Sequence, residues 1–204
     1  MKSINTIGSS KLSDKDRELL DFYQTPTFAT ESLVNSKLIG DGCIWEPMAG
    51  NGAISKVLAQ HNFKVISSDV IERDYKLDFV CDFFNNDIDV NATQIVTNPP
   101  YKYADDFIVK CLSENKPDFL GVFLPIRYLE GKKRYMQIYS KYKPSDVIVF
   151  AKRLGCYKDS DVKNGVAITE YGIGSAVAYM WLCFTKNKTT GLYDNIDTKM
   201  HWIY

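Results

Sequence analysis

The sequence predicts an α/β fold with a mainly parallel sheet and helices on both of its faces. Six short apolar, β-branched segments alternate with longer segments of helical spacing, and this alternation is typical of parallel strands joined by crossover helices. The expected strands are residues 43–46, 64–69, 94–98, 119–125, 146–150 and 178–184. The expected helices are roughly 26–38, 52–61, 102–115 and 129–142, and Pro26 stands near a first helical turn, where proline is favoured.

Length and composition favour one soluble domain that spans residues 1–204. With 45% hydrophobic and 25% charged residues, the chain can bury a full core. Segments 1–20 and 186–204 could be tails. No apolar run reaches the roughly 20 residues of a membrane-spanning helix, and the first residues do not resemble a secretion signal. We therefore expect a cytoplasmic protein without a membrane partner. Its five scattered cysteines favour reduced thiols over disulfides or a metal site.

Charge is distributed unevenly along a chain whose net charge is zero. Residues 1–100 carry 9 Lys and Arg against 14 Asp and Glu, so the second half holds the positive excess. Within 127–158 there are nine basic residues against two acidic ones, with tyrosines between them. This segment could bind a polyanion, although charge alone fits a solvated helix face and loop equally well.

A glycine-rich turn follows the first expected strand at residues 46–52, EPMAGNG. Gly50 and Gly52 let the backbone approach a ligand closely, and the helix behind them offers free N–H groups. At the end of the second strand, Asp69 can accept hydrogen bonds from both hydroxyls of a ribose. Together these features indicate a nucleoside pocket. A nicotinamide dinucleotide site would use similar parts, but Ser55 stands where that fingerprint has its third glycine.

The tetrapeptide Asn98-Pro99-Pro100-Tyr101 ends the third expected strand. An adenine N6 amine is a poor nucleophile, so an enzyme that alkylates it must hold both of its hydrogens. The Asn98 side-chain oxygen and the Pro99 carbonyl can do this, while the prolines stiffen the turn and Tyr101 stacks on the base. Ligands of open α/β sheets bind at the carboxyl edge, where this turn, the glycine turn and Asp69 all lie.

These motifs, in this order, resemble those of a known enzyme family. DFYQTP (21–26), EPMAGNG (46–52), Asp69, CDFF (81–84) and NPPY (98–101) are similar to the motif series of class I S-adenosylmethionine-dependent DNA adenine-N6 methyltransferases. Segments 123–134, 149–157 and 178–184 further resemble the small adenine methyltransferases of bacteriophages and prophages. The resemblance implies a Rossmann-like class I methyltransferase fold, with a mainly parallel seven-stranded sheet and an antiparallel last strand.

The resemblance also implies an activity and a set of site residues. The activity is direct transfer of a methyl group from S-adenosylmethionine to the N6 amine of a flipped-out adenine in DNA. The implied catalytic residues are Asn98, Pro99, Pro100 and Tyr101. The implied cofactor-binding residues are Tyr23, Gln24, Thr25 and Pro26 over the methionine end; Glu46, Pro47, Ala49, Gly50 and Gly52 along the amino acid moiety; Asp69 at the ribose; Asp82 and Phe83 at the adenine; and Asn98. No metal is expected.

The sequence departs from the family pattern in how it could recognise DNA. No separate target-recognition domain is expected, since only about 20 residues follow segment 178–184. Recognition would then be relaxed, or depend on loop 151–176 and the basic segment, or need a partner subunit or homodimer. The candidates for nucleic-acid contact are Arg127, Lys132, Lys133, Arg134, Lys152, Arg153 and, as a second stacking aromatic, Tyr157.

Three alternatives to this function stay open. The first keeps the chemistry but changes the acceptor to an RNA adenine or a protein glutamine, which the NPPY motif also serves. The second is a non-catalytic homologue that binds the cofactor or DNA. The third, a nicotinamide-dependent oxidoreductase, leaves NPPY unexplained. If the chain is phage-encoded, it would act in the cytoplasm of a bacterial host and could mask DNA from restriction.

Overall fold

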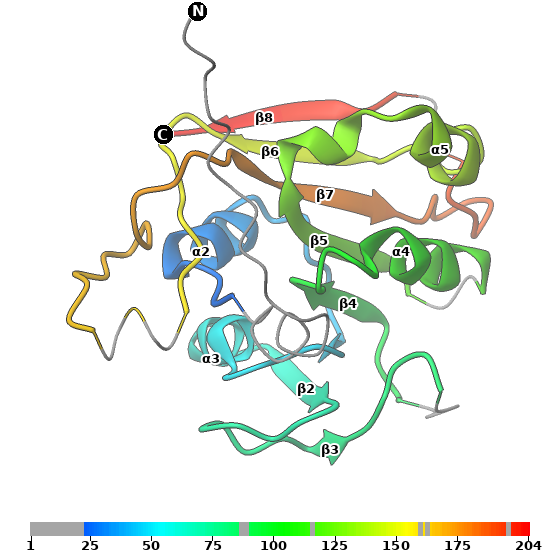
Figure 1. Cartoon of the computed structure of the whole chain (residues 1–204). Helices are drawn as coiled ribbons and strands as arrows, with labels where there is room; N and C mark the ends of the chain where they lie inside the picture. The colour runs from blue at the N-terminus through cyan, green and yellow to red at the C-terminus, as the bar shows by residue number, and fades with distance from the viewer. Residues whose placement is uncertain (1–22, 86–89, 115–116, 159–160, 162–163, 195–196) are drawn as a thin grey trace, which may run out of the picture.

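The chain folds into a single central sheet with helices on both faces (Figure 1). The computed structural model describes residues 23–85, 90–114, 117–158, 161, 164–194 and 197–204. Its strands are β1 (Cys43–Glu46), β2 (Lys64–Asp69), β3 (Phe79–Val80), β4 (Gln94–Thr97), β5 (Phe119–Pro125), β6 (Asp146–Phe150), β7 (Tyr179–Thr185) and β8 (Lys199–Ile203). Its main helices are α2 (Thr27–Asn35), α3 (Ala53–Gln60) and α4 (Ala104–Ser113).

The strands lie in the order β3-β2-β1-β4-β5-β7-β6-β8. Strands β3, β2, β1, β4 and β5 pair in parallel, and β7 inserts antiparallel between β5 and β6. Because β7 reverses direction on both sides, β5 and β6 point the same way, and the carboxyl ends of β1, β2, β4, β5 and β6 share one edge. The predicted fold class, a mainly parallel sheet between helices, is confirmed, and all six predicted strands are present.

The sheet has eight strands, one more than the resemblance implied, and its antiparallel strand is not the last one. The last strand, β8, lies within the segment 186–204 that could have been a tail, and it pairs in parallel with β6 at the sheet edge. Both β8 and β3 are largely exposed. Neither has the run of apolar residues from which a buried strand is predicted, so the sequence did not indicate them. The other expected tail, 1–20, lies outside the described residues.

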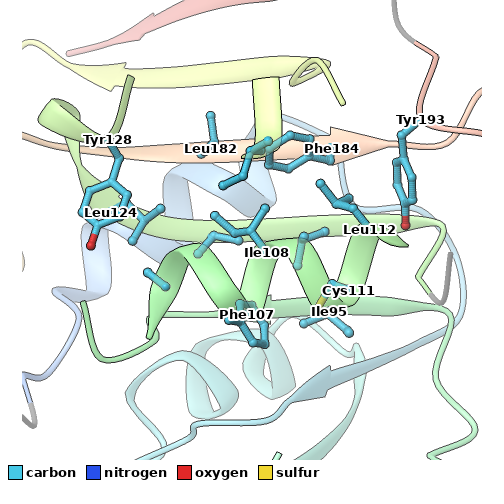
Figure 2. Packing of buried hydrophobic residues seen from close by; sticks show 14 of the residues in the cluster. Ile95, Phe107, Ile108, Cys111, Leu112, Leu124, Tyr128, Leu182, Phe184 and Tyr193 are labelled. Atoms are coloured by element: carbon cyan, nitrogen blue, oxygen red, sulfur yellow. The ribbon is translucent and has the colours of Figure 1, made fainter. Parts of the chain in front are cut away.

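Side chains alternate between two cores along β7, as the twofold repeat of a strand requires. Met180, Leu182 and Phe184 point toward α4, whereas Trp181 and Cys183 point toward α2 and α3. Figure 2 shows the first core, where Ile108 and Leu112 of α4 lie on the same face of the sheet as Leu182 and Phe184. The sheet is therefore buried on both faces, which explains why its central strands are apolar throughout.

The expected helix at 129–142 is broken into three short pieces. A 3₁₀ turn, η1 (Ile126–Leu129), is followed by α5 (Lys132–Arg134) and by one π-helical turn, η2 (Tyr135–Tyr139). Gly131 separates the first two with a φ of 108°, which only glycine adopts readily. The apolar spacing of this segment could not reveal that interruption.

Among the described residues, no helix is long and apolar enough to cross a membrane. The five cysteines are free thiols, and all but Cys43 are buried.

Candidate active site

The glycine turn is tied to the end of β2, as the parallel pairing of β1 with β2 allows. Gly50 and Gly52 have φ values of 58° and 75°, so both adopt the left-handed conformation that favours glycine. The Gly50 N–H donates to Asp69 Oδ2 at 2.8 Å, and the Ala49 N–H donates to the Ser68 carbonyl at 2.9 Å. The turn and Asp69 are thus held as one unit at the carboxyl edge.

Glu46 opens this turn and does not line the cavity described below, so its expected contact with the cofactor stays a prediction. Its side chain is buried and accepts hydrogen bonds from the Ser55 N–H, at 2.8 Å, and from the Ser55 hydroxyl. Ser55 is the third residue of α3, so the carboxyl group satisfies an N–H at the start of that helix. Burial raises the pKa of Glu46 to about 8, against the opposing hydrogen bonds from Ser55.

The raised pKa of Glu46 predicts a pH-dependent stability. Its pKa in the folded protein lies above that of an unfolded chain, so its contribution is complete at about pH 4 and is lost as the pH rises through 8. Glu46→Gln should remove this trend and gain stability relative to wild type between pH 5 and pH 9. Urea unfolding across that range checks it, with exposed Glu130→Gln as the control. Parallel curves for wild type and Glu46→Gln would contradict the assignment.

Two carboxylates line the cavity beyond the turn. Asp69 Oδ1 accepts from the Ile71 N–H at 3.3 Å and lies 3.5 Å from the Arg73 guanidinium. Asp82 accepts from the Phe84 N–H at 2.8 Å and from the Asn85 side chain at 2.6 Å, so it fixes its own turn. Each carboxylate therefore has a position set by backbone groups before any ligand binds.

The NPPY tetrapeptide leaves β4 at the same edge. The Asn98 side-chain nitrogen donates to the Tyr23 carbonyl at 3.3 Å and to the Thr25 hydroxyl at 3.0 Å. These contacts fix the orientation of the amide, and they leave its oxygen as the group that can accept from a ligand. The segment expected over the methionine end, 23–26, thus positions Asn98.

Tyr101 is held from several sides by residues for which the sequence predicted no role. Its carbonyl accepts from the Tyr128 hydroxyl at 2.7 Å, and its ring lies 6.4 Å from the rings of both Tyr128 and Tyr179. Its hydroxyl is buried without a hydrogen-bond partner of good geometry, next to Cys156, and burial raises its pKa far above the usual value. Fixed in this way, the ring can serve as a rigid stacking surface.

Cys156 lies beside Tyr101 and Asn98, and burial favours the protonated form of its thiol. Burial raises its pKa to about 12, although Tyr179, Tyr101 and Asn98 lie within hydrogen-bonding reach. A protonated thiol is a weak nucleophile. Cys156 is therefore poorly suited to act as a nucleophile in this site.

One cavity of about 730 Å³ collects most of these groups. It is lined by nine of the predicted residues, namely Tyr23, Pro47, Asp69, Asp82, Phe83, Asn98, Pro99, Pro100 and Tyr101. The remaining predicted cofactor residues, Gln24, Thr25, Pro26, Glu46, Ala49, Gly50 and Gly52, shape the surrounding turns without lining it. Sequence reasoning missed Met48, Val70, Ile71, Arg73, Phe84, Asn85, Lys102, Tyr103 and Asp106. Most of these residues lie in or within a few positions of a recognised motif. That proximity was the only feature of the sequence that could have indicated them as cavity residues.

The predicted basic residues form two groups at the carboxyl edge, after β5 and after β6. In the first, Arg127, Lys132 and Lys133 are exposed and make no ion pair within the described part of the chain. Arg134 differs, because its guanidinium is paired with Asp105 at 2.7 Å and packs 4.1 Å from the centre of the Tyr128 ring. Arg134 thus joins α4 to the chain after β5 as an internal brace. Because its charge is already paired, it is the least suited of the predicted residues to bind a phosphate.

In the second basic group, two side chains contact their own loop. Lys152 lies 3.6 Å from the centre of the Tyr171 ring, and Arg153 donates to the Ala176 carbonyl at 2.8 Å. Tyr157 pairs with Gln24 through a backbone bridge, which brings this loop beside the segment that holds Asn98. The two basic groups therefore flank one edge of the sheet, although they are far apart in sequence.

Comparison with known proteins supports the fold. No family model matches the chain, and no curated protein matches it. Among solved structures, the chain is similar to a dimethyladenosine transferase from Plasmodium falciparum, with a TM-score of 0.52 and 12% identity. The match covers 82% of this chain and 64% of that structure's chain, so this chain spans less than two thirds of its neighbour. The two share the Rossmann-like methyltransferase fold.

Proposed function

We propose that this protein transfers a methyl group from S-adenosylmethionine to the N6 amine of adenine in DNA. The observation that carries the proposal is the placement of Asn98. It lies at the carboxyl end of β4, lines the cavity, and has its amide fixed by Tyr23 and Thr25 so that its oxygen can accept. This is the arrangement that a planar amine needs, because alkylation requires its hydrogens to be held.

The residues around the cavity fit this cofactor in size and in chemistry. A volume of about 730 Å³ lies within the roughly 300–1,000 Å³ that is usual for small-molecule sites. Asp69 at the end of β2 suits ribose hydroxyls, and Asp82 beside Phe83 suits an adenine amine and its ring. When bound, S-adenosylmethionine supplies an electrophilic methyl group on its sulfonium.

The chain's own contribution to the reaction is positioning. The Asn98 oxygen and the Pro99 carbonyl accept from the amine hydrogens, which aims the nitrogen lone pair at the methyl carbon. The rigidly held Tyr101 ring supports the base by stacking. Positive charge develops on the amine nitrogen as its bond to the methyl carbon forms and the bond from that carbon to sulfur breaks. The Asn98 and Pro99 oxygens stabilise this charge, and one amine proton then passes to solvent water.

The glycine turn offers a test of cofactor binding. A Cβ on Gly52 would lie 2.5 Å from the Tyr75 ring, in addition to the strain of a φ of 75°. Gly52→Ala should weaken S-adenosylmethionine binding about tenfold, which calorimetry measures. Gly191 is a matched control, because its φ is 68° but a Cβ there meets nothing within 4 Å. Equal cofactor affinity of the Gly52→Ala and Gly191→Ala proteins would show that the turn does not contact the ligand.

A nucleic-acid acceptor is supported by the exposed cations at the carboxyl edge. Arg127, Lys132 and Lys133 lie on the chain that leaves β5, and the second basic group leaves β6. Cations on both sides of a site favour a polyanion as the substrate. A glutamine in a protein would gain nothing from them. DNA target recognition would then fall to these segments or to a partner subunit, including a second copy of the chain.

An RNA adenine is the second candidate acceptor, and one observation favours it. The structural neighbour is described as a dimethyladenosine transferase, so an adenosine amine is the acceptor group that its name indicates. The phosphate contacts expected of the basic groups would serve RNA as well as DNA.

One experiment tests the chemistry and separates the acceptors. The protein is incubated with S-adenosylmethionine that carries a labelled methyl group and with pools of DNA, RNA and protein, and the products are identified by mass spectrometry. We expect N6-methyladenine in DNA. Label in RNA adenine would favour the second candidate, and label in glutamine, or none at all, would overturn the proposal.

A further inference from the structure

The turn between β5 and α5 is a rigid projection beside the NPPY motif. Its backbone curves around one side chain, because Arg134 donates to the carbonyls of Arg127 and Tyr128 at 3.4 Å and of Glu130 at 2.6 Å. The same guanidinium is paired with Asp105 on α4. A single, partly buried brace thus fixes the shape of residues 126–131, hereafter the β5 turn.

The β5 turn is also fastened directly to the proposed catalytic segment. Tyr128 donates its hydroxyl to the Tyr101 carbonyl at 2.7 Å, and the Tyr128 carbonyl accepts from the Tyr139 hydroxyl at 2.6 Å. Tyr128 therefore points inward and is buried, whereas the next residue, Leu129, is 40% exposed. Two apolar side chains of this turn, Ile126 and Leu129, are exposed, and Leu129 is the one adjacent in sequence to the residue that holds Tyr101.

The surroundings of Leu129 indicate which partner could cover it. Exposed Arg127 precedes it, the exposed carboxylate of Glu130 directly follows it, and exposed Lys132 and Lys133 come next, so the cations outnumber the one anion. An apolar side chain flanked by cations matches a surface that is anionic outside and apolar inside, which describes a duplex with phosphates around stacked bases. A protein partner with an apolar patch would offer no such ring of negative charge.

Resting on the function proposed above, we infer that Leu129 is a wedge that enters the base stack of duplex DNA when an adenine is flipped into the cavity. Flipping leaves a gap in the stack and costs a few kcal/mol, and an inserted apolar side chain offsets part of that cost. The rigid turn favours insertion. Because Arg134 fixes its backbone, the turn loses little conformational freedom on binding.

The wedge makes a prediction that concerns duplex DNA alone. Leu129→Ala should lower the rate of methylation of duplex DNA about tenfold and leave the rate on single-stranded DNA unchanged, since a single strand needs no unstacking. Leu129→Met keeps an apolar side chain of similar size and should restore the duplex rate. Leu192→Ala is the control, because Leu192 is equally apolar and 54% exposed but follows β7 at the opposite edge of the sheet.

A second readout does not depend on methylation. In duplexes that carry 2-aminopurine in place of adenine within varied flanking sequences, wild type and Leu192→Ala should raise the fluorescence, and Leu129→Ala should not. Wild type that raises the fluorescence but methylates nothing would overturn the proposed function and not the wedge. Three results for Leu129→Ala would overturn the wedge. They are an equal loss of methylation rate on single-stranded and duplex DNA, an unchanged rate on duplex DNA, and a fluorescence rise as large as that of wild type. A fluorescence rise with RNA duplexes only would overturn it as well.

Discussion

Asn98→Ala should lower the rate of methyl transfer by roughly a hundred- to a thousand-fold, the loss expected when one positioned polar group is removed from a reaction centre. The amide oxygen is the group that accepts from the amine, and alanine offers no substitute. Its nitrogen also holds Tyr23 and Thr25 at 3.3 and 3.0 Å, so the cavity wall should loosen as well. Single-turnover methylation separates the chemical step from product release.

Two further variants make this result specific. Asn98→Asp keeps an acceptor oxygen but loses the donor to Tyr23 and Thr25, so we expect a rate between those of wild type and Asn98→Ala. Asn91→Ala removes an exposed amide before β4, at the other edge of the sheet, and should leave the rate unchanged. A wild-type rate for Asn98→Ala would remove the basis of the proposed mechanism.

Trp181→Ala should lower the free energy of unfolding by about 3–5 kcal/mol. The indole is fully buried on β7 between α2 and the sheet, and its Nε1 donates to the Ala29 carbonyl at 2.7 Å. Alanine would leave a cavity and would remove this hydrogen bond. Since α2 follows directly after the segment that holds Asn98, the loss should also reduce activity. Urea unfolding followed by circular dichroism measures the effect.

Two tryptophan variants provide controls for packing and for burial. Trp181→Phe keeps most of the volume but loses the hydrogen bond to Ala29, so we expect a smaller loss of about 1–3 kcal/mol. Trp202 on the edge strand β8 is 68% exposed, and Trp202→Ala should change stability by no more than about 0.5 kcal/mol. Equal effects at positions 181 and 202 would contradict the packing described for β7.

The candidate site was predictable where chemistry depends on a short segment of chain. Asn98 and Tyr101 belong to one tetrapeptide that directly follows a predicted strand. Residues that follow a parallel strand lie at the carboxyl edge of the sheet, so their position could be predicted. Asp69 also ends a strand, so the rule that ligands bind at this edge brought it to the same place. Glu46 ends a strand too, yet its side chain does not line the cavity. Its carboxylate turns into the interior to cap α3 through Ser55, and no pattern of spacing reports the direction of a single side chain.

By itself, the sequence determined the layered α/β architecture, six of the strands and nine of the residues that line the cavity, because these follow from apolar periodicity and local turn chemistry. Only the tertiary structure decided that Arg134 is an internal brace, that Tyr128 holds Tyr101, and that exposed β8 completes the sheet. Each of these depends on a partner far away in the chain or on which side chain faces water. Such pairings are selected by packing of the whole molecule and leave little trace in neighbouring residues.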